Sequence, residues 1–293
     1  MSRVWNWIEG GFFYVDYGRL IGGERMKSMI FAAGLGTRLK PITDTLPKAL
    51  VPVAGKPLIE HVTRKLWSYG IREVVVNVHS FADKIEDWIA DQSWITTKRD
   101  ELTDENILFE VSDERLLLLE TGGAIMRARG YLEGCGKFLI HNVDILSNCD
   151  FEWFENQVRE DALATLLVSR RKTSRYFLFE PDSSRLVGWM NTQTGESVMV
   201  NSSIAPEDCT PLAFSGIHIL SDRVFEAMDE YLLEMGLPVD VEKGTRFPIK
   251  DFYLWAAKKY PIYAAVAEDL ELIDVGKLDT LTLAEDYVKC NLK

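Results

Sequence analysis

Residues 28–57 read SMIFAAGLGTRLKPITDTLPKALVPVAGKP, a short apolar run followed by a long segment rich in glycine and proline. The apolar run, Ser28–Ala33, has the length and composition of a buried strand. The breakers between Gly34 and Gly55 exclude a continuous helix and predict an ordered functional loop. Pro57 stands where proline favours the first turn of a helix, and Gly70 is placed to end that helix.

Strand and helix patterns alternate on the C-terminal side of this loop. Apolar runs predict strands, and apolar residues at helical spacing predict helices. The expected strands are residues 72–78, 107–111 and 137–143, and the expected helices are residues 57–70, 81–90 and 122–131. Such alternation is typical of βαβ units, so we predict an α/β fold with a mainly parallel sheet.

The second half of the chain has a different rhythm, with long strand patterns and a hairpin. The expected elements are strands over 163–170, 212–220 and 270–275, a hairpin over 175–179 and 186–190, and helices over 252–259 and 277–288. No internal repeat, low-complexity tract or linker is visible. We therefore predict one domain over residues 26–293.

Residues 1–25 are rich in aromatic side chains and lack the basic start and continuous apolar stretch of a signal peptide. Because the globular pattern begins only after Met26, we predict that residues 1–25 are an extension and that Met26 is the native start. The alternative is an aromatic arm that packs on the domain or on a partner. The intact mass of the protein from its native source distinguishes the two.

Composition narrows the class of protein. With 47% hydrophobic and 27% charged residues, the 293-residue chain has the make-up of a globular protein. Its formal net charge of −12 disfavours general nucleic-acid binding, which usually needs a basic surface. Four cysteines without CxxC spacing predict reduced thiols, and no apolar run has transmembrane length. We expect a cytoplasmic protein without a membrane or nucleic-acid partner, and the oligomeric state stays open.

Three kinds of glycine-bearing nucleotide loop are candidates for residues 34–57. A Rossmann dinucleotide loop needs G-x-G-x-x-G, but Leu39 stands at the third glycine position. A Walker A loop needs Ser or Thr after Gly-Lys, but Pro57 follows Lys56. The third pattern, roughly AGGxGTRLxPLTxxxPKxLxPVxGKPxI, matches through the whole segment.

This third pattern is the signature loop of the sugar-1-phosphate nucleotidyltransferases, and the chain resembles that family over nearly all of residues 26–293. The resemblance is strongest over residues 29–60. It implies a Rossmann-like, GT-A-type three-layer sandwich with a mixed, mainly parallel central sheet. It also implies an enzyme that uses Mg²⁺ to join a sugar 1-phosphate to the nucleoside monophosphate part of an NTP, releasing pyrophosphate.

The resemblance also implies roles for individual residues. Arg38 grips the NTP phosphates over the attacked phosphorus, and Lys48 reaches the phosphates on the sugar side. A glycine turn beside the nucleobase belongs to the nucleotide site, although Thr121 could instead be an ordinary helix cap. The implied nucleotide-binding residues are Ala32, Ala33, Gly34, Leu35, Gly36, Thr37, Thr121, Gly122 and Gly123, and the implied substrate-binding residues are Asn142, Ser215 and Gly216. Arg175 belongs to a polar, basic patch with Thr173 and Ser174 that could bind the sugar or its phosphate, and a solvated hairpin explains it equally well.

The charge of the loop agrees with these roles. Arg38, Lys40, Lys48 and Lys56 are opposed in the loop only by Asp44, within a protein of net charge −12. Glycines let backbone amides approach phosphate oxygens closely. A basic loop on an acidic protein attracts polyanionic substrates such as a triphosphate and a sugar phosphate. Lys56 is equally well explained as a solvated turn residue.

Two aspartates each follow an apolar run, Asp144 after FLIHNV and Asp274 after LELI. Open α/β sheets bind ligands at the carboxyl ends of their strands. Mg²⁺ prefers a few carboxylates together with substrate phosphate oxygens. The resemblance makes both aspartates metal ligands, although Val143 replaces the glycine that the family places before the first. A lone aspartate at a strand end is otherwise a cap for the next helix.

Within the family, the compact length, the ETGGA turn and the ending IDVGKLDTLTLAE most resemble members that join UTP to N-acetylmuramic acid 1-phosphate. Mannose-1-phosphate guanylyltransferases and glucose-1-phosphate thymidylyl- or uridylyltransferases share the signature loop. A non-catalytic sugar-nucleotide sensor is the alternative from another class. The four histidines, His61, His79, His141 and His218, are scattered and predict no catalytic triad.

Overall fold

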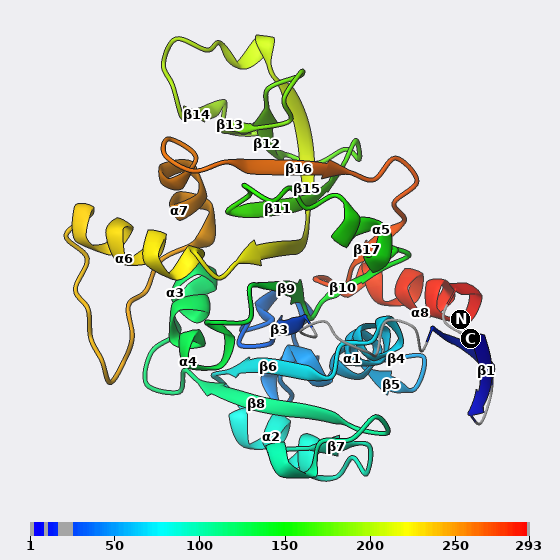
Figure 1. Ribbon diagram of the computed structural model, residues 1–293. Coiled ribbons are helices and arrows are strands. Elements are labelled where there is room, and N and C mark those ends of the chain that lie inside the picture. Colours follow the sequence, from blue (N-terminus) through cyan, green and yellow to red (C-terminus); the bar gives the residue numbers. More distant parts are fainter. Residues whose placement is uncertain (1–2, 9–10, 17–25, 292–293) are drawn as a thin grey trace.

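The computed structural model describes residues 3–8, 11–16 and 26–291, and its centre is a mixed sheet (Figure 1). In this part of the chain the sheet has 11 strands. The main path runs β14 (Glu196–Met199), β13 (Leu186–Asn191), β12 (Arg175–Phe179), β15 (Thr210–Ser221), β9 (Lys137–Asn142), β3 (Lys27–Phe31), β6 (Glu73–Val78), β8 (Ile107–Asp113) and β7 (Ile95–Thr96). Beside this path, β11 (Ala164–Ser169) pairs with β15 and with β16 (Ile262–Val266).

The centre of the sheet is parallel, as the alternating pattern predicts. β3 pairs in parallel with β6 and β9, and β6 pairs in parallel with β8. β15 runs antiparallel to β9 and begins the mixed half of the sheet. The predicted α/β fold class is confirmed, and the carboxyl ends of β3, β6, β8 and β9 meet at one edge.

Helices cover both faces of the sheet. On one face, Ile30 and Val76 pack with α1 (Leu58–Tyr69), α2 (Ala82–Ala90), α5 (Phe151–Asn156) and α8 (Asp279–Asn291). On the other face, Met29 and Val75 pack with α3 (Glu120–Arg127), α4 (Arg129–Leu132), α6 (Val224–Glu234) and α7 (Ile249–Ala256). Because both faces are buried, the central strands are continuous apolar runs instead of alternating ones.

Three small antiparallel sheets lie outside the central one. They are β1 (Arg3–Ile8) with β2 (Gly11–Asp16), β4 (Pro52–Val53) with β5 (Lys56–Pro57), and β10 (Ile145–Ser147) with β17 (Leu272–Asp274). In the described residues, β1 and β2 pair only with each other. Residues 1–2, 9–10 and 17–25 lie outside the described part, so the native start at Met26 and the single domain stay predictions.

The helix expected over residues 122–131 was wrong in its bounds. α3 begins earlier, at Glu120, and contains the glycine pair, and α4 is a separate short helix. The reason is tertiary: the glycines pack against residues 245–247, as described below. Several elements were missed altogether, among them α5, α6, β10, β14 and β16. α5 had a readable signal, because the Asp150 carboxylate caps it by accepting from the amides of Glu152 and Trp153 at 2.8 and 3.1 Å.

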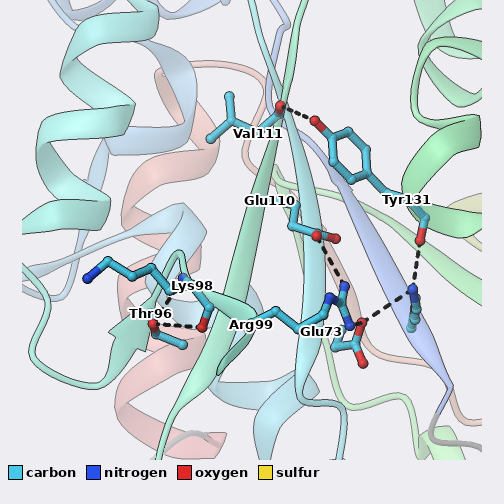
Figure 2. Close-up of polar contacts among 8 residues, drawn as sticks. Glu73, Thr96, Lys98, Arg99, Glu110, Val111 and Tyr131 are labelled. Carbon is cyan, nitrogen blue, oxygen red and sulfur yellow. Dashed lines mark hydrogen bonds and ion pairs between the residues drawn. The ribbon is translucent and has the colours of Figure 1, made fainter. Parts of the chain in front are cut away.

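Ion pairs and a hydrogen bond link β6 and β8 to neighbouring segments of the chain (Figure 2). Arg99 donates to Glu73 on β6 at 2.8 Å and to Glu110 on β8 at 3.1 Å. The Tyr131 hydroxyl donates to the Val111 carbonyl at 3.3 Å, which joins α4 to β8. These charged groups are satisfied by one another, so they belong to the scaffold.

Two expectations from composition can be compared with the described residues. The four cysteines in this part of the chain are all free thiols. None of the helices in residues 3–8, 11–16 and 26–291 is long and apolar enough to cross a membrane.

His218 gives the fold a pH-dependent stability. It lies buried on β15, where its ring shares a hydrogen bond with the Tyr253 hydroxyl on α7. Burial lowers the pKa of His218 from 6.5 to about 3. Between these values the unfolded chain binds the extra proton, so the folded state loses stability as the pH falls below 6.5.

We expect the stability difference between wild type and His218→Gln to shrink on acidification, by at most about 1.4 kcal/mol per pH unit. Glutamine does not titrate, and groups that both proteins share cancel in the difference. Urea unfolding at half-unit steps from pH 7.5 to 4 measures this. Between pH 7 and 7.5 the two curves should run parallel. Parallel curves down to pH 4 would contradict the prediction.

Candidate active site

A buried polar network fixes the carboxyl ends of three parallel strands. The Asn77 side chain on β6 accepts hydrogen bonds from the amides of Ala32 at 2.7 Å and Ala33 at 3.3 Å, just after β3. The same amide group donates to Glu114 at 2.8 Å, beyond β8. Glu114 also accepts from the Leu119 amide at 3.1 Å, before α3, and burial raises the pKa of its carboxyl. This network fixes the backbone of residues 32–33, from which the signature loop begins.

The network also corrects the expectation for Ala32 and Ala33. Their amides are already bonded to Asn77, so in this arrangement they have no hydrogen to offer a phosphate. The amides of Gly34, Leu35 and Gly36 donate to no acceptor in the described part of the chain. Gly34 and Leu35 are exposed. Three successive amides without an acceptor at a strand end are available to an anion.

Gly36 is the loop position where only glycine fits. Its φ is +62°, in the left-handed region, and an added Cβ would lie 2.8 Å from the Thr43 methyl group. The Thr43 hydroxyl donates to the Gly36 carbonyl at 2.8 Å and closes the turn. The loop then continues through three short 3₁₀ turns, Thr37–Leu39, Ile42–Asp44 and Lys48–Leu50. The first and third of these turns present Arg38 and Lys48.

The structure brings Lys48 and Asp144 together. The Lys48 ammonium forms an ion pair with the Asp144 carboxylate, and the two side chains are only 11% and 17% exposed. They are 96 residues apart in the sequence. The pairing follows from topology, because β3 and β9 are neighbours and both the loop and Asp144 follow the carboxyl ends of these strands.

Asp274 joins this pair through the small β10–β17 sheet. Asp274 lies opposite Ile145 in the register, and the Val275 amide donates to the Asp144 carbonyl at 2.8 Å. Burial and the nearby Asp144 charge raise the pKa of the Asp274 carboxyl, while Lys48, Arg38 and Arg171 oppose this shift. The two aspartates and three cations therefore form one electrostatic cluster.

Gly276 allows this cluster to close. An added Cβ would lie 2.6 Å from the Arg38 guanidinium and 2.6 Å from an Asp274 carboxylate oxygen. Arg38, from the first half of the chain, and Asp274, from its end, thus both approach Gly276 closely because it has no side chain. The glycine has a steric purpose here and not a conformational one, because its φ lies outside the left-handed region.

We expect Gly276→Ala to lower kcat/KM by about 100-fold while the protein stays folded. The methyl group must displace Arg38, Asp274 or both, and a displacement of about 1 Å in a reacting geometry costs that much. Gly130→Ala is the matched control, since a Cβ at Gly130 meets nothing within 4 Å. Steady-state kinetics and a thermal melt measure both effects. Unchanged activity in Gly276→Ala would show that the close approach is unimportant.

The two carboxylates fit a divalent cation. Among the described residues there is no group of three or more His, Cys, Asp or Glu side chains that could cage a metal. Asp144 and Asp274 would therefore fill only part of a coordination sphere and leave the rest to water and substrate oxygens, which is the arrangement Mg²⁺ favours. Burial, and after it the charge of Asp144, raise the pKa of the Asp274 carboxyl, and a bound cation would offset both effects.

The glycine pair of α3 lies in a different setting from the one expected. The amides of Gly122 and Gly123 both donate to the Phe247 carbonyl, at 2.9 and 3.1 Å, and a Cβ on Gly123 would lie 2.1 Å from the Thr245 oxygen. The Thr121 hydroxyl accepts from the Ile249 amide at 3.0 Å. These three residues thus join α3 to the start of α7, and their amides and hydroxyl have partners within the protein.

Residues of β15 also belong to the candidate site. Its Gly216 has φ +77°, and an added Cβ would lie 2.6 Å from the Asn142 side-chain nitrogen, so these two residues do adjoin. Ser215 was expected to bind substrate, but its hydroxyl is buried and donates to the Leu167 carbonyl at 2.7 Å across a β-bulge. Its side chain therefore serves the bulge.

Arg175 is exposed at the start of β12, opposite Asn191, and its role in substrate binding stays a prediction. The charge of Arg171, which the sequence analysis did not single out, acts on the pKa of Asp274. The one available signal was its position, just after the apolar run of β11. Asn77 was also missed, because a single asparagine in a valine-rich strand has no distinctive local pattern.

His61 and His79 both bond to backbone carbonyls. His61 is buried on α1 and shares a hydrogen bond of 2.8 Å with the Val53 carbonyl, and burial lowers its pKa. His79 shares one of 2.7 Å with the Glu114 carbonyl. Neither histidine acts on the pKa of Asp274.

Comparisons with known proteins identify similar sequences. Residues 27–190 match a family model described as nucleotidyl transferase. The chain is 32% identical over 202 residues to the N-acetylmuramate alpha-1-phosphate uridylyltransferase of Caulobacter vibrioides, covering 67% of this chain and 76% of that protein. It is 24% identical over 265 residues to a probable glucose-1-phosphate cytidylyltransferase of Bacillus subtilis, covering 86% and 96% of the two chains.

The fold is also similar to solved structures. A UDP-glucose pyrophosphorylase complexed with UDP-glucose superposes with a TM-score of 0.64, over 91% of this chain and 100% of that one, at 19% identity. At that level of identity the likeness concerns the fold alone.

Proposed function

The chain belongs to the nucleotidyl transferase family and is a sugar-1-phosphate nucleotidyltransferase, and from this premise we propose that it transfers the uridylyl group of UTP to N-acetylmuramate 1-phosphate. One observation carries the proposed chemistry: Arg38, Lys48, Asp144 and Asp274, far apart in the sequence, form one charged cluster at the carboxyl edge of the sheet. The similarity to the Caulobacter vibrioides enzyme supports the choice of substrates.

The reaction is a direct displacement at phosphorus. A phosphate oxygen of the sugar 1-phosphate attacks the α-phosphorus of UTP, and the bond from that phosphorus to the bridging oxygen of pyrophosphate breaks. The electron pair leaves with pyrophosphate. The attacking phosphate is already an anion at neutral pH, so no general base is needed, which agrees with the structural roles of the histidines. Catalysis then consists of positioning and of charge stabilisation.

The signature loop binds the nucleotide in this proposal. The free amides of Gly34, Leu35 and Gly36 donate to phosphate oxygens, and Arg38 neutralises charge on the phosphates next to the attacked phosphorus. Thr37 is exposed beside them and contacts the same phosphates. Asn77 and Glu114 act indirectly, by holding the backbone of residues 32–33 in place.

Lys48 and the aspartates act on the transferred group. Asp144 and Asp274 would hold Mg²⁺, which would supply positive charge to stabilise the reacting phosphates. When the substrates bind, Lys48 leaves its ion pair with Asp144 and donates to a phosphate oxygen on the sugar side. Asn142 at the end of β9 and Gly216 on β15 adjoin, and in this proposal they contact the sugar.

A pyrophosphate-release assay tests the proposal. UTP, GTP, dTTP, CTP and ATP are each combined with N-acetylmuramate 1-phosphate, mannose 1-phosphate and glucose 1-phosphate, with Mg²⁺ and with EDTA as control. We expect UTP with N-acetylmuramate 1-phosphate to exceed every other pair by at least about tenfold. A stronger signal from another pair, such as CTP with glucose 1-phosphate, would overturn the substrate choice. Silence of folded protein with all pairs would favour a sugar-nucleotide sensor.

A further inference from the structure

We propose that Arg171 binds the phosphate of the sugar 1-phosphate and holds its attacking oxygen in line with the NTP. This inference rests on the proposed function and adds to it a residue from the second half of the chain. Arg171 lies in the connection between β11 and β12, two residues after the strand end at Ser169. It would touch substrate directly.

The hydrogen bonding of Arg171 leaves most of its donors free. One guanidinium nitrogen donates to the Phe214 carbonyl on β15 at 2.8 Å. In residues 26–291 no carboxylate lies within ion-pair distance of Arg171, unlike its neighbour Arg170, which pairs with Glu268 at 3.4 Å. A guanidinium has five N–H donors in a planar fork that matches phosphate geometry. Arg171 is therefore anchored by one donor and has the others available to a ligand.

Arg171 lies at the same edge of the sheet as Asp144, because β11 and β9 both run antiparallel to β15. Its side chain is exposed to solvent, yet the surrounding protein atoms lower the pKa of its guanidinium. Asp274 has the same combination, an exposed side chain with a pKa shifted by burial. The charges of Arg171 and Asp274 each act on the other's pKa, so the two groups lie near each other. A ligand can enter where water now reaches.

The strand order places Arg171 on the sugar side of the metal pair. Asp144 follows β9, whose neighbours in the sheet are β3 on one side and β15 on the other. Arg38 and Lys48 come from the loop after β3. Arg171 is held by Phe214 of β15. The NTP lies on the loop after β3, so a cation on the β15 side is placed for the second phosphate.

The charges of the site require such a cation. Two polyanions must approach within bonding distance of each other, and Lys48 begins the reaction paired with Asp144. With Arg38 assigned to the NTP, Arg171 is the further cation that acts on Asp274. An arginine that grips the phosphate by two donors also restricts its rotation, which favours in-line attack.

The test compares Arg171→Met, Arg171→Lys and the control Arg170→Met. For Arg171→Met we expect the KM for N-acetylmuramate 1-phosphate to rise about 10- to 100-fold, the loss of a charged hydrogen-bond pair, with the KM for UTP within about twofold. Arg171→Lys should recover part of the loss, because it restores the charge without the fork. Arg170→Met should behave as wild type, and thermal melts check that all three variants fold.

Isothermal titration with N-acetylmuramate 1-phosphate separates this inference from the proposed function. If wild type binds the sugar phosphate but releases no pyrophosphate, the proposed reaction fails while the role of Arg171 is still tested by its loss of binding. A KM change for UTP in place of the sugar phosphate would overturn the inference. So would equal affinities of wild type and Arg171→Met, or a matching loss in Arg170→Met.

Discussion

Asp144→Asn is expected to lower kcat/KM by about 1000-fold. Asparagine has nearly the same size and can still accept a hydrogen bond from Lys48, so the local packing survives. It removes the negative charge from the position where the metal would bind, and it removes one of the two carboxylates that face the transferred group. The loss should therefore be in turnover and in the Mg²⁺ concentration needed for half-maximal rate. Rate measurements over a Mg²⁺ titration check both.

The control for this variant is Asp150→Asn. Asp150 lies six positions further along the chain and caps α5, and asparagine caps a helix as well as aspartate. The Asp150→Asn variant loses the same negative charge near the same edge of the sheet, but outside the charged cluster of the site. We expect wild-type kinetics from it. If Asp144→Asn kept activity within tenfold of wild type, with an unchanged Mg²⁺ dependence, the assignment of Asp144 as a metal ligand would be untenable.

Arg38→Met is expected to lower kcat by about 1000-fold, the lower end of the effect of a transition-state arginine in phosphoryl transfer. Arg38 stands in the first turn of the loop, its side chain is exposed, and its guanidinium meets Asp274 over Gly276. Methionine keeps much of the length of the side chain and removes the charge. Because charge accumulates on the leaving pyrophosphate, the loss should fall on kcat more than on the KM for UTP.

Arg170→Met again serves as the control, since it removes an arginine that pairs with Glu268 at the surface. Arg38→Lys should retain part of the rate, because a point charge replaces the fork. Single-turnover measurements at saturating substrates separate chemistry from product release. A normal single-turnover rate in Arg38→Met would mean that Arg38 serves binding or architecture alone.

Local sequence was sufficient for much of the fold. Ser28–Ala33, the glycine-rich loop, the helix ended by Gly70 and the alternating strands all depend on near neighbours in the chain, and the structure contains them. The misjudged helix at residues 122–131 depended on a distant partner. Glycines disfavour a helix interior, but here Phe247 accepts two of their amide hydrogens and residues 245–247 leave no room for a side chain.

The sequence by itself determined the chemical class, because the signature loop is continuous and its residues act as neighbours. It also picked out Asp144 and Asp274, each by the apolar run that precedes it, although β17, the short strand that Asp274 ends, is only partly buried. Only the tertiary structure decided which groups meet: Lys48 pairs with Asp144, Asn77 takes the amides of Ala32 and Ala33, and the β15 wall receives Arg171. These contacts depend on strand order and on register across tens of residues, and local propensity and periodicity do not determine either.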